Sequence, residues 1–246
     1  LPEKNIFSYI LIKMISKYCA DYIFFISKNE KERFFKDNLK SKIKGSIMEN
    51  IFHTKHKVSN YSNQKEYTII YLGNISYNKG VDRLIELAKY FKSKNNSFYR
   101  IRIYGVARNN QLYFNNLKEQ INLNNLKNIE FKEHTLNVID ILKNSFILIR
   151  PSRDNDPWGR DIIEAASIGL PVIATGVYDN IIKHGKNGYL LNEYSNEEVY
   201  KYCEELRKNQ FKWNAFRDYS LNNIRKKYIG NVQEAIFNEA IKSLYK

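Results

Sequence analysis

The stretch that decides the fold is IRPSRDNDPWGRDIIEAASIGLPVIATG, residues 149–176. An apolar run ends at Pro151, a polar and turn-forming run follows, and a helical pattern then leads into the apolar residues 171–175. Short continuous apolar runs joined by a helix are typical of parallel strands that are buried on both faces. Ligands bind to such open sheets at the carboxyl ends of the strands, so this polar run lies where ligand chemistry is expected.

The same alternation extends over residues 67–192. The apolar segments predict strands within residues 67–73, 98–105, 128–133, 146–152, 171–175 and 187–192. Helical periodicity predicts helices over residues 81–93, 110–123, 135–145 and 159–169. We therefore predict an α/β fold in which helices cover both faces of a parallel sheet and the crossovers are right-handed.

The flanking regions have a different pattern. Residues 1–53 predict a helix over 6–18, then a strand over 21–27 and a second helix. Residues 54–66 are polar and rich in turn formers, which indicates a linker. From residue 196 to residue 246 the pattern is helical only.

The positive net charge of the chain has more than one explanation. The chain has 246 residues, 43% of them hydrophobic, and a formal net charge of +14. This charge suits anionic partners such as phosphorylated small molecules or an acidic membrane surface, but abundant Lys, Asn, Ile and Tyr are equally expected from an AT-rich genome. No recognition motif for nucleic acid is present, so we predict no nucleic-acid partner.

The cysteines and the apolar N-terminal run indicate a cytoplasmic setting. Cys19 and Cys203 are far apart and have no metal-ligand spacing, and His53 and His56 lack further ligands. The apolar residues 6–15 are too few to span a bilayer and lack the cleavage site of a signal peptide.

The opening stretch combines groups for phosphate and groups for hydroxyls. The first amides of the helix that begins near Gly159 and Arg160 attract anions, and the Arg160 guanidinium adds a positive charge. Glu164 lies one turn further on, and Asp156 in the loop can reach a sugar hydroxyl. A nucleotide sugar presents both kinds of group, although a solvated loop with surface ion pairs explains the same residues about as well.

A second loop strengthens the first interpretation. The residues YLGNISYNKGVDRLIE place Lys79 and Gly80 between the first strand and the first helix of the sheet. Lys79 is expected at the same carboxyl edge, as a second charge for phosphate. The spacing fits neither G-x-G-x-x-G nor the P-loop, which disfavours a dinucleotide dehydrogenase and a P-loop ATPase.

Together these motifs resemble the retaining glycosyltransferases of family 4, which have the two-domain GT-B architecture. The resemblance is strong over residues 67–192, and the matching motifs are Gly73-Asn74, Lys79-Gly80-Val81-Asp82, Pro151-Ser152, Asp156-Pro157-Trp158-Gly159, Glu164-Ala165, Gly169-Leu170-Pro171-Val172 and Gly185-Lys186-Asn187-Gly188. Two positions depart from the family pattern. Asp156 replaces the usual Glu, and Asn74 replaces the usual Arg, which removes one charge for the diphosphate. Arg150, Arg153 and Arg160 are the alternatives for supplying that charge.

The resemblance implies a role for each matching residue. The implied catalytic residues are Asp156 at the sugar ring, Glu164 on the ribose hydroxyls and Lys79 on the diphosphate. The implied donor-binding residues are Gly73, Asn74, Lys79, Gly105, Arg153, Trp158, Gly159, Arg160 and Glu164. The resemblance implies retention of configuration, no metal and no cofactor besides the nucleotide sugar, which is the substrate. It leaves open whether the donor is a UDP-sugar or a GDP-sugar.

The resemblance also divides the chain. Residues 1–53 are expected to be the last part of an incomplete N-terminal acceptor-side domain, residues 67–195 the Rossmann-like nucleotide-sugar-binding domain, and residues 196–246 helices that pack back toward the N-terminal domain. The apolar faces of these helices, with Trp213, Phe216, Tyr219 and Leu221, are then expected to be partly uncovered. The remaining N-terminal domain or a partner chain is an expected partner.

Two functions follow from this division. In one, the chain transfers a sugar to a glycan or lipid-linked acceptor, for example in bacterial polysaccharide biosynthesis at the inner face of the membrane. In the other, it is a nucleotide-sugar-binding module, or a truncated fragment, that is inactive by itself.

Overall fold

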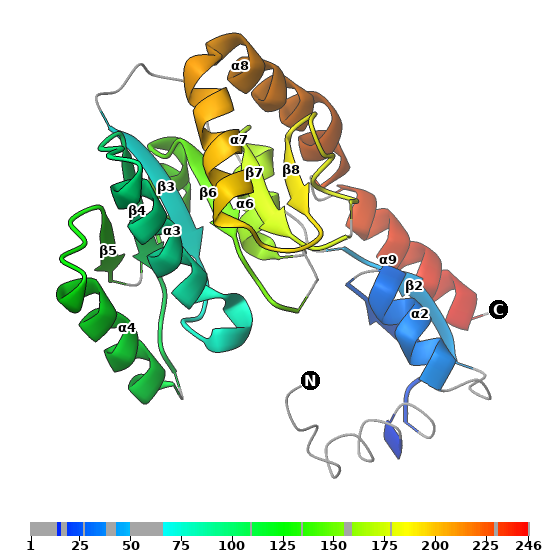
Figure 1. Ribbon diagram of the computed structural model, residues 1–246. Helices are drawn as coiled ribbons and strands as arrows, with labels where there is room; N and C mark the ends of the chain where they lie inside the picture. The colour runs from blue at the N-terminus through cyan, green and yellow to red at the C-terminus, as the bar shows by residue number, and fades with distance from the viewer. Residues whose placement is uncertain are drawn as a thin grey trace. The chain divides into compact units, whose positions relative to one another are not determined.

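The computed structural model of the chain (Figure 1) describes residues 14–15, 19–26, 28–37, 43–49, 66–108, 110–133, 135–154, 159–177, 179–228 and 231–245. The contacts divide the chain into two compact units, each with its own sheet. One unit comprises Leu1–His53 with Tyr228–Lys246, and the other comprises Thr54–Lys227.

The larger unit is built on a six-stranded sheet with the strand order β5-β4-β3-β6-β7-β8, in which all pairs are parallel. Its strands are β3 (Tyr67–Leu72), β4 (Tyr99–Tyr104), β5 (Ile129–Lys132), β6 (Ile147–Arg150), β7 (Val172–Thr175) and β8 (Gly188–Leu191). Each strand lies within a segment that the apolar pattern predicts. The strand order reverses between β3 and β6, so the carboxyl ends of these two strands flank the crevice in which such sheets bind ligands.

Helices pack around this sheet in two groups (Figure 1). The first group is α3 (Val81–Ser93), α4 (Gln111–Leu123) and α7 (Asn196–Lys208), in which α3 contacts both others. The second is α5 (Val138–Lys143), α6 (Arg160–Ser167) and the π-helical segment η2 (Ser220–Arg225), in which α6 contacts both others. Helix α8 (Gln210–Tyr219) contacts α7 and η2, and a short 3₁₀ turn, η1 (Tyr77–Lys79), precedes α3. The predicted α/β architecture, with a parallel sheet and helices around it, is thus confirmed.

The core explains why the helices dock. Buried aliphatic side chains from β3, β6 and β7 meet the apolar stripes of α3 and α6. Trp213 of α8 is also buried, and its indole Nε1 donates to the carbonyl oxygen of Phe146 at 3.0 Å. Phe216 is buried one turn further on. The expectation of a partly uncovered face is therefore wrong for these two residues, because α8 packs within the larger unit, whereas Tyr219 and Leu221 are half-buried.

The smaller unit contains a parallel pair, β1 (Tyr22–Phe25) and β2 (Lys44–Ile47), joined through α2 (Lys28–Asp37). Phe25 of β1 contacts the rings of Phe34 and Phe35 in α2, with ring centroids 5.4 Å and 5.8 Å apart. Helix α9 (Asn231–Leu244) packs on this pair, and the Lys44 ammonium donates to the carbonyl oxygen of Ser243 at 3.1 Å. Strand β1 was predicted within residues 21–27, whereas β2 was not predicted.

Two predicted segments lie largely outside the described residues. Of the predicted helix over 6–18, the structure describes only Met14 and Ile15, both helical. Of the predicted linker over 54–66, it describes only Glu66. Within the part of the chain that the structure describes, no helix combines the length and the apolar character needed to cross a bilayer.

Candidate functional site

A pocket of about 540 Å³ opens where β3 and β6 end. Its lining includes Tyr71, Gly73, Asn74, Lys79, Arg150, Arg160 and Asp161. These residues come from the end of β3, from η1, from the end of β6 and from the first turn of α6. The pocket therefore lies at the reversal of strand order, where the sequence places ligand chemistry.

Gly80 allows the two loops of this pocket to touch. Its φ is 70°, and a Cβ atom at this position would lie 1.9 Å from the carbonyl oxygen of Pro151. The Arg83 guanidinium stabilises the loop after β6, because it donates to the carbonyl oxygens of Pro151 at 2.9 Å and Ser152 at 3.2 Å. This close approach brings Lys79, just before Gly80, to the end of β6.

The Lys79 ammonium pairs with a carboxylate of the opposite loop. Its Nζ lies 2.7 Å from Oδ2 of Asp154, and both side chains are about one-third exposed. Burial alone would raise the pKa of Asp154, but the hydrogen bonds to its carboxylate and the charges of Lys79 and Arg150 together outweigh burial and hold the pKa below its usual range. The predicted phosphate-binding cation is thus in the pocket, with an internal anion beside it.

Arg153 has structural partners instead of facing the pocket. Its guanidinium makes a two-pronged pair with the Asp82 carboxylate, with N–O distances of 2.8 Å and 2.6 Å. It also lies 3.7 Å from the ring centroid of Tyr77, and the Tyr113 hydroxyl donates to Asp82 at 2.7 Å. Arg153 is not among the residues that line the pocket. Its assignment to donor binding stays a prediction, and the contacts describe a residue that fixes the loop onto the start of α3.

The first turn of α6 presents charge to the pocket. Gly159 is the N-cap residue in extended backbone, and the first amides of an α-helix have no acceptor within it. Nε of Arg160 donates to Oε1 of Glu164 at 3.1 Å, with 78% of the Arg160 side chain exposed but only 14% of the Glu164 side chain. Burial raises the pKa of Glu164 above its usual range, and the pair with Arg160 only partly offsets this. The Glu164 carboxylate is therefore poorly solvated and suited to further hydrogen bonds.

A buried ion pair and a tyrosine complete the lining; Arg150 is one of the three arginines expected to supply the missing diphosphate charge, whereas Asp161 and Tyr71 had no predicted role. Nη1 of Arg150 lies 2.6 Å from Oδ1 of Asp161, and each side chain is 12% exposed. The Tyr71 hydroxyl donates to the carbonyl oxygen of Asn74 at 2.8 Å, which fixes the turn after β3. A sequence signal for Arg150 and Tyr71 exists, because each stands at or near the carboxyl end of a predicted strand, where ligands bind to parallel sheets.

The remaining predicted residues fall into two groups. Gly73 and Asn74 line the pocket. Gly105 lies beside Gly73, so close that a Cβ atom on Gly105 would be 2.0 Å from the Gly73 carbonyl oxygen. Asp156 and Trp158 lie outside the described residues. Among the residues that the structure describes, no group of three or more His, Cys, Asp or Glu side chains is arranged to hold a metal ion.

Comparisons with known proteins agree with this architecture. The family model of the glycosyl transferases group 1 matches residues 52–226, which is more than half of the chain. A search of curated proteins found no match.

Among solved structures, HepE (Alr3699) of Anabaena in complex with UDP-glucose superposes with a TM-score of 0.85 at 16% identity, over 98% of this chain and 68% of HepE. A TarM variant of S. aureus, in complex with fondaparinux, α-GlcNAc-glycerol and UDP, gives 0.80 at 18% identity, over 100% of this chain and 49% of TarM. Sucrose-phosphate synthase of Thermosynechococcus elongatus gives 0.80 at 14% identity, over 99% and 63%.

The chain thus spans about two thirds of HepE and about half of TarM. At these identities the likeness establishes the fold, which is of the Rossmann-like GT-B type. Because the family model covers more than half of the sequence and the fold agrees with it, the chain belongs to the glycosyl transferases group 1.

Proposed function

We propose that the chain binds a nucleotide-sugar donor in the pocket between β3 and β6 and transfers the sugar, with retention, to a glycan or lipid-linked acceptor. The observation that supports this most is the convergence of Lys79, Arg150 and Arg160 on one pocket beside the first turn of α6. UDP-sugars and GDP-sugars are both candidates. The complexes of HepE with UDP-glucose and of TarM with UDP make UDP the first nucleotide to test.

The donor diphosphate is the ligand group that this charge set fits. Positive side chains and helix amides together form an anion site, and a diphosphate has acceptor oxygens for each of them. The Lys79 ammonium pairs with the Asp154 carboxylate, and the Arg160 guanidinium pairs with the Glu164 carboxylate. We infer that the diphosphate replaces these carboxylates. Since Arg160 is largely exposed, its side chain is free to turn toward the phosphate.

Glu164 is the proposed partner of the ribose. Its carboxylate is mostly buried and poorly solvated, so two vicinal hydroxyls that donate to it replace hydration that the fold has removed. The same step releases Arg160 from Glu164. Ribose binding and diphosphate binding are therefore coupled through one ion pair.

Catalysis on this proposal is stabilisation of the leaving group. As the bond from the anomeric carbon to the diphosphate breaks, negative charge grows on the departing oxygen beside Lys79, Arg150 and the α6 amides. The acceptor hydroxyl attacks the anomeric carbon from the face that the diphosphate leaves, so the configuration is retained. The proton of this hydroxyl passes to a diphosphate oxygen. These cations act where a divalent metal acts in other transferases. Asp156 is proposed to contact the sugar ring.

The other partners remain proposals as well. Asn74 lines the pocket without a charge, so Arg150 and Arg160 are proposed to supply the charge that an Arg beside Gly73 would add. The acceptor is proposed to bind with the participation of further N-terminal structure, in this chain's full protein or in a partner. The positive charge of the chain suits cytoplasmic contact with an anionic membrane.

Turnover separates a transferase from a binding module. The full chain is incubated with UDP-glucose, UDP-N-acetylglucosamine and GDP-mannose, each together with an octyl glycoside as the acceptor, and ¹H NMR follows free nucleotide and the anomeric signals of the glycosylated acceptor. Release of nucleotide with an α-configured glycoside supports retaining transfer. An inverted product would contradict retention, and saturable donor binding without turnover would favour the alternative of a nucleotide-sugar-binding module or a fragment that is inactive by itself.

A further inference from the structure

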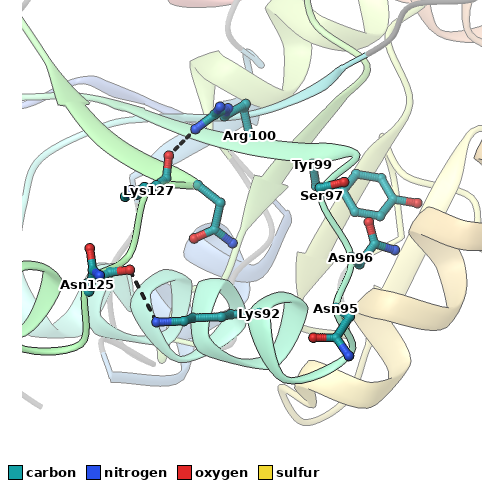
Figure 2. Close-up of a pocket in the computed structure, with 9 residues that line it drawn as sticks. Lys92, Asn95, Asn96, Ser97, Tyr99, Arg100, Asn125 and Lys127 are labelled. Atoms are coloured by element: carbon teal, nitrogen blue, oxygen red, sulfur yellow. Dashed lines mark hydrogen bonds between the residues drawn. The ribbon is translucent and has the colours of Figure 1, made fainter.

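A second pocket, of about 460 Å³, lies at the opposite edge of the same sheet (Figure 2). It is formed where α3 turns into β4 and where α4 turns into β5, so it belongs to the amino ends of the strands. Its volume is in the range of small-molecule sites. Among the described residues nine line this pocket; four of them are asparagines, and none of the nine has a carboxylate or an aliphatic hydrocarbon side chain.

The two turns that form this pocket have the same backbone. Helix α3 ends with Asn95 at a φ of 51°, and the amide of Asn96 donates to the carbonyl oxygen of Phe91 at 3.0 Å. Helix α4 ends with Asn125 at a φ of 45°, and the amide of Leu126 donates to the carbonyl oxygen of Ile121 at 3.0 Å. Both ends are Schellman motifs with Asn in the left-handed position that glycine usually occupies. The Asn95 and Asn125 side chains thus project from fixed backbone.

The fold already uses most of the positive charge around this pocket. The Lys92 ammonium donates to the carbonyl oxygens of Asn124 at 2.9 Å and Asn125 at 3.3 Å, as Figure 2 shows for Asn125. The Arg100 guanidinium pairs with the Glu66 carboxylate and donates to the carbonyl oxygen of Lys127. The C-terminal ends of α3 and α4 add partial negative charge at this edge. Because these cations are already hydrogen-bonded and the helix ends are partly negative, this pocket is a poor binding site for an anion. The pocket at the carboxyl edge differs in this respect.

Apart from the Lys127 ammonium, the groups that remain are neutral donors and acceptors. Within the described part of the chain, the side chains of Asn95 and Asn125 have no protein partner, and both residues are exposed. Ser97 and Lys127 are exposed beside them. A carboxamide offers two N–H donors and one carbonyl acceptor, which matches a pair of vicinal hydroxyls that each donate and accept. An apolar ligand would leave these groups unpaired.

We propose that this pocket is a second carbohydrate site, which binds the hydroxyls of a neutral oligosaccharide through Asn95 and Asn125. The site is separate from the proposed donor pocket and does not depend on it. If the proposed transferase function also holds, a glycan held at this edge is an acceptor or product chain kept on the enzyme between transfers.

The test uses the full ¹⁵N-labelled chain and its side-chain amide signals. Maltohexaose, cellohexaose, chitohexaose and mannohexaose are titrated separately, and the Asn95 and Asn125 signals are assigned by their loss in single variants. We expect at least one of these probes to shift both signals in a saturable way. If none of the four shifts them, or if inorganic phosphate shifts them and the sugars do not, the proposal fails.

The matched variant is Asn95→Gly with Asn125→Gly. Glycine adopts the left-handed backbone more readily than asparagine, so the turns and the stability of the protein are expected to be kept. The amides are removed, and sugar binding followed through the backbone signals of Ser97 and Lys127 is expected to weaken about tenfold or more. Equal binding by this variant would contradict the proposal.

A UDP titration of the same samples separates the two sites. UDP is expected to shift signals near Lys79 and Glu164 equally in the wild type and in the double variant. Sugar binding without any UDP binding would support this second site and would count against the proposed donor pocket alone.

Discussion

Three ion pairs show how individual residues prepare the candidate donor site. Lys79 pairs with Asp154, Arg150 with Asp161, and Arg160 with Glu164. The pair of Arg150 with Asp161 is mostly buried, so separating it would leave a buried charge, which is costly. The other two pairs each have a partner that is at least one-third exposed. They are the pairs that an incoming diphosphate can open.

Asp154 is expected to compete with the donor for Lys79. Replacing it in Asp154→Asn removes the competing charge, and partly exposed pairs are worth about 0.2 to 1 kcal/mol, so UDP is expected to bind up to about fivefold more tightly. Isothermal titration with UDP measures this change.

Asp179→Asn is the matched control for that experiment. Asp179 pairs with Lys183 at 2.9 Å in a more exposed setting than Asp154, and neither residue lines the donor pocket. This control is expected to leave UDP affinity unchanged. Weaker UDP binding by Asp154→Asn, or an equal gain in the control, would rule out competition for Lys79.

Glu164 is expected to make stability depend on pH. Because burial raises its pKa in the folded protein, the neutral carboxyl contributes stability that is fully present below the unfolded pKa and is lost as pH rises through the folded pKa. Glu164→Gln keeps the size but never ionises. The variant is thus expected to have a higher Tm than the wild type at pH 7 and a smaller advantage at pH 4. A difference that is constant across this range would show that ionisation of Glu164 does not matter.

At the scale of elements, the contact between two loops positions Lys79. A residue other than glycine in the left-handed backbone conformation costs roughly 1 to 2 kcal/mol. Gly80→Ala is expected to lower the free energy of unfolding by more than this, because the Cβ atom of Ala would also collide with the Pro151 carbonyl oxygen. It is also expected to weaken UDP binding. Urea unfolding and UDP titration measure the two effects.

Gly185→Ala separates backbone strain from collision. Gly185 has a φ of 73°, and a Cβ atom there would have no neighbour within 4 Å. This variant is expected to lose only the backbone contribution and to keep UDP affinity. If both variants lose the same stability and both keep UDP affinity, the contact of Gly80 with Pro151 does not position the site.

The sequence was sufficient for the elements whose signal is local. Strands β3, β4, β5, β6, β7 and β8 follow from continuous apolar runs, and α3 from its apolar stripe. Strand β2, with the sequence KGSI, was missed because Lys, Gly and Ser have low strand propensity, and its pairing with β1 sets its structure. Burial of Trp213 was missed for a related reason, since it depends on a long-range bond to Phe146.

In the candidate site, too, only the features with a local signal could be predicted. Lys79, Asn74 and Arg160 line one pocket, and the sequence places their loops at the same carboxyl edge of the sheet because each loop follows a predicted strand; their role in donor binding stays a prediction. The partners of these residues were not predicted, because an ion pair such as Lys79 with Asp154 joins loops 75 residues apart. Arg153 shows the limit most clearly: its charge suggests a ligand, and only the contacts with Asp82 and Tyr77 reveal a structural use.

At the scale of the whole molecule, the net charge of +14 is expected to assist donor binding through the solvent. Added salt screens such interactions, so UDP binding is expected to weaken severalfold between low and high ionic strength. Uridine, which has no phosphate, is the control and is expected to bind equally at both. A UDP affinity that does not respond to salt would mean that the cations of the pocket do not face the phosphates.

The most direct test of the central claim is isothermal titration of the full chain with UDP, GDP and their sugars, repeated with Glu164→Ala. We predict saturable binding of one nucleotide at one site, weakened by at least about tenfold in the variant because hydrogen bonds to a charged group are lost. Failure of a folded wild-type chain to bind any of these nucleotides would contradict the proposed donor site, as would equal binding by Glu164→Ala.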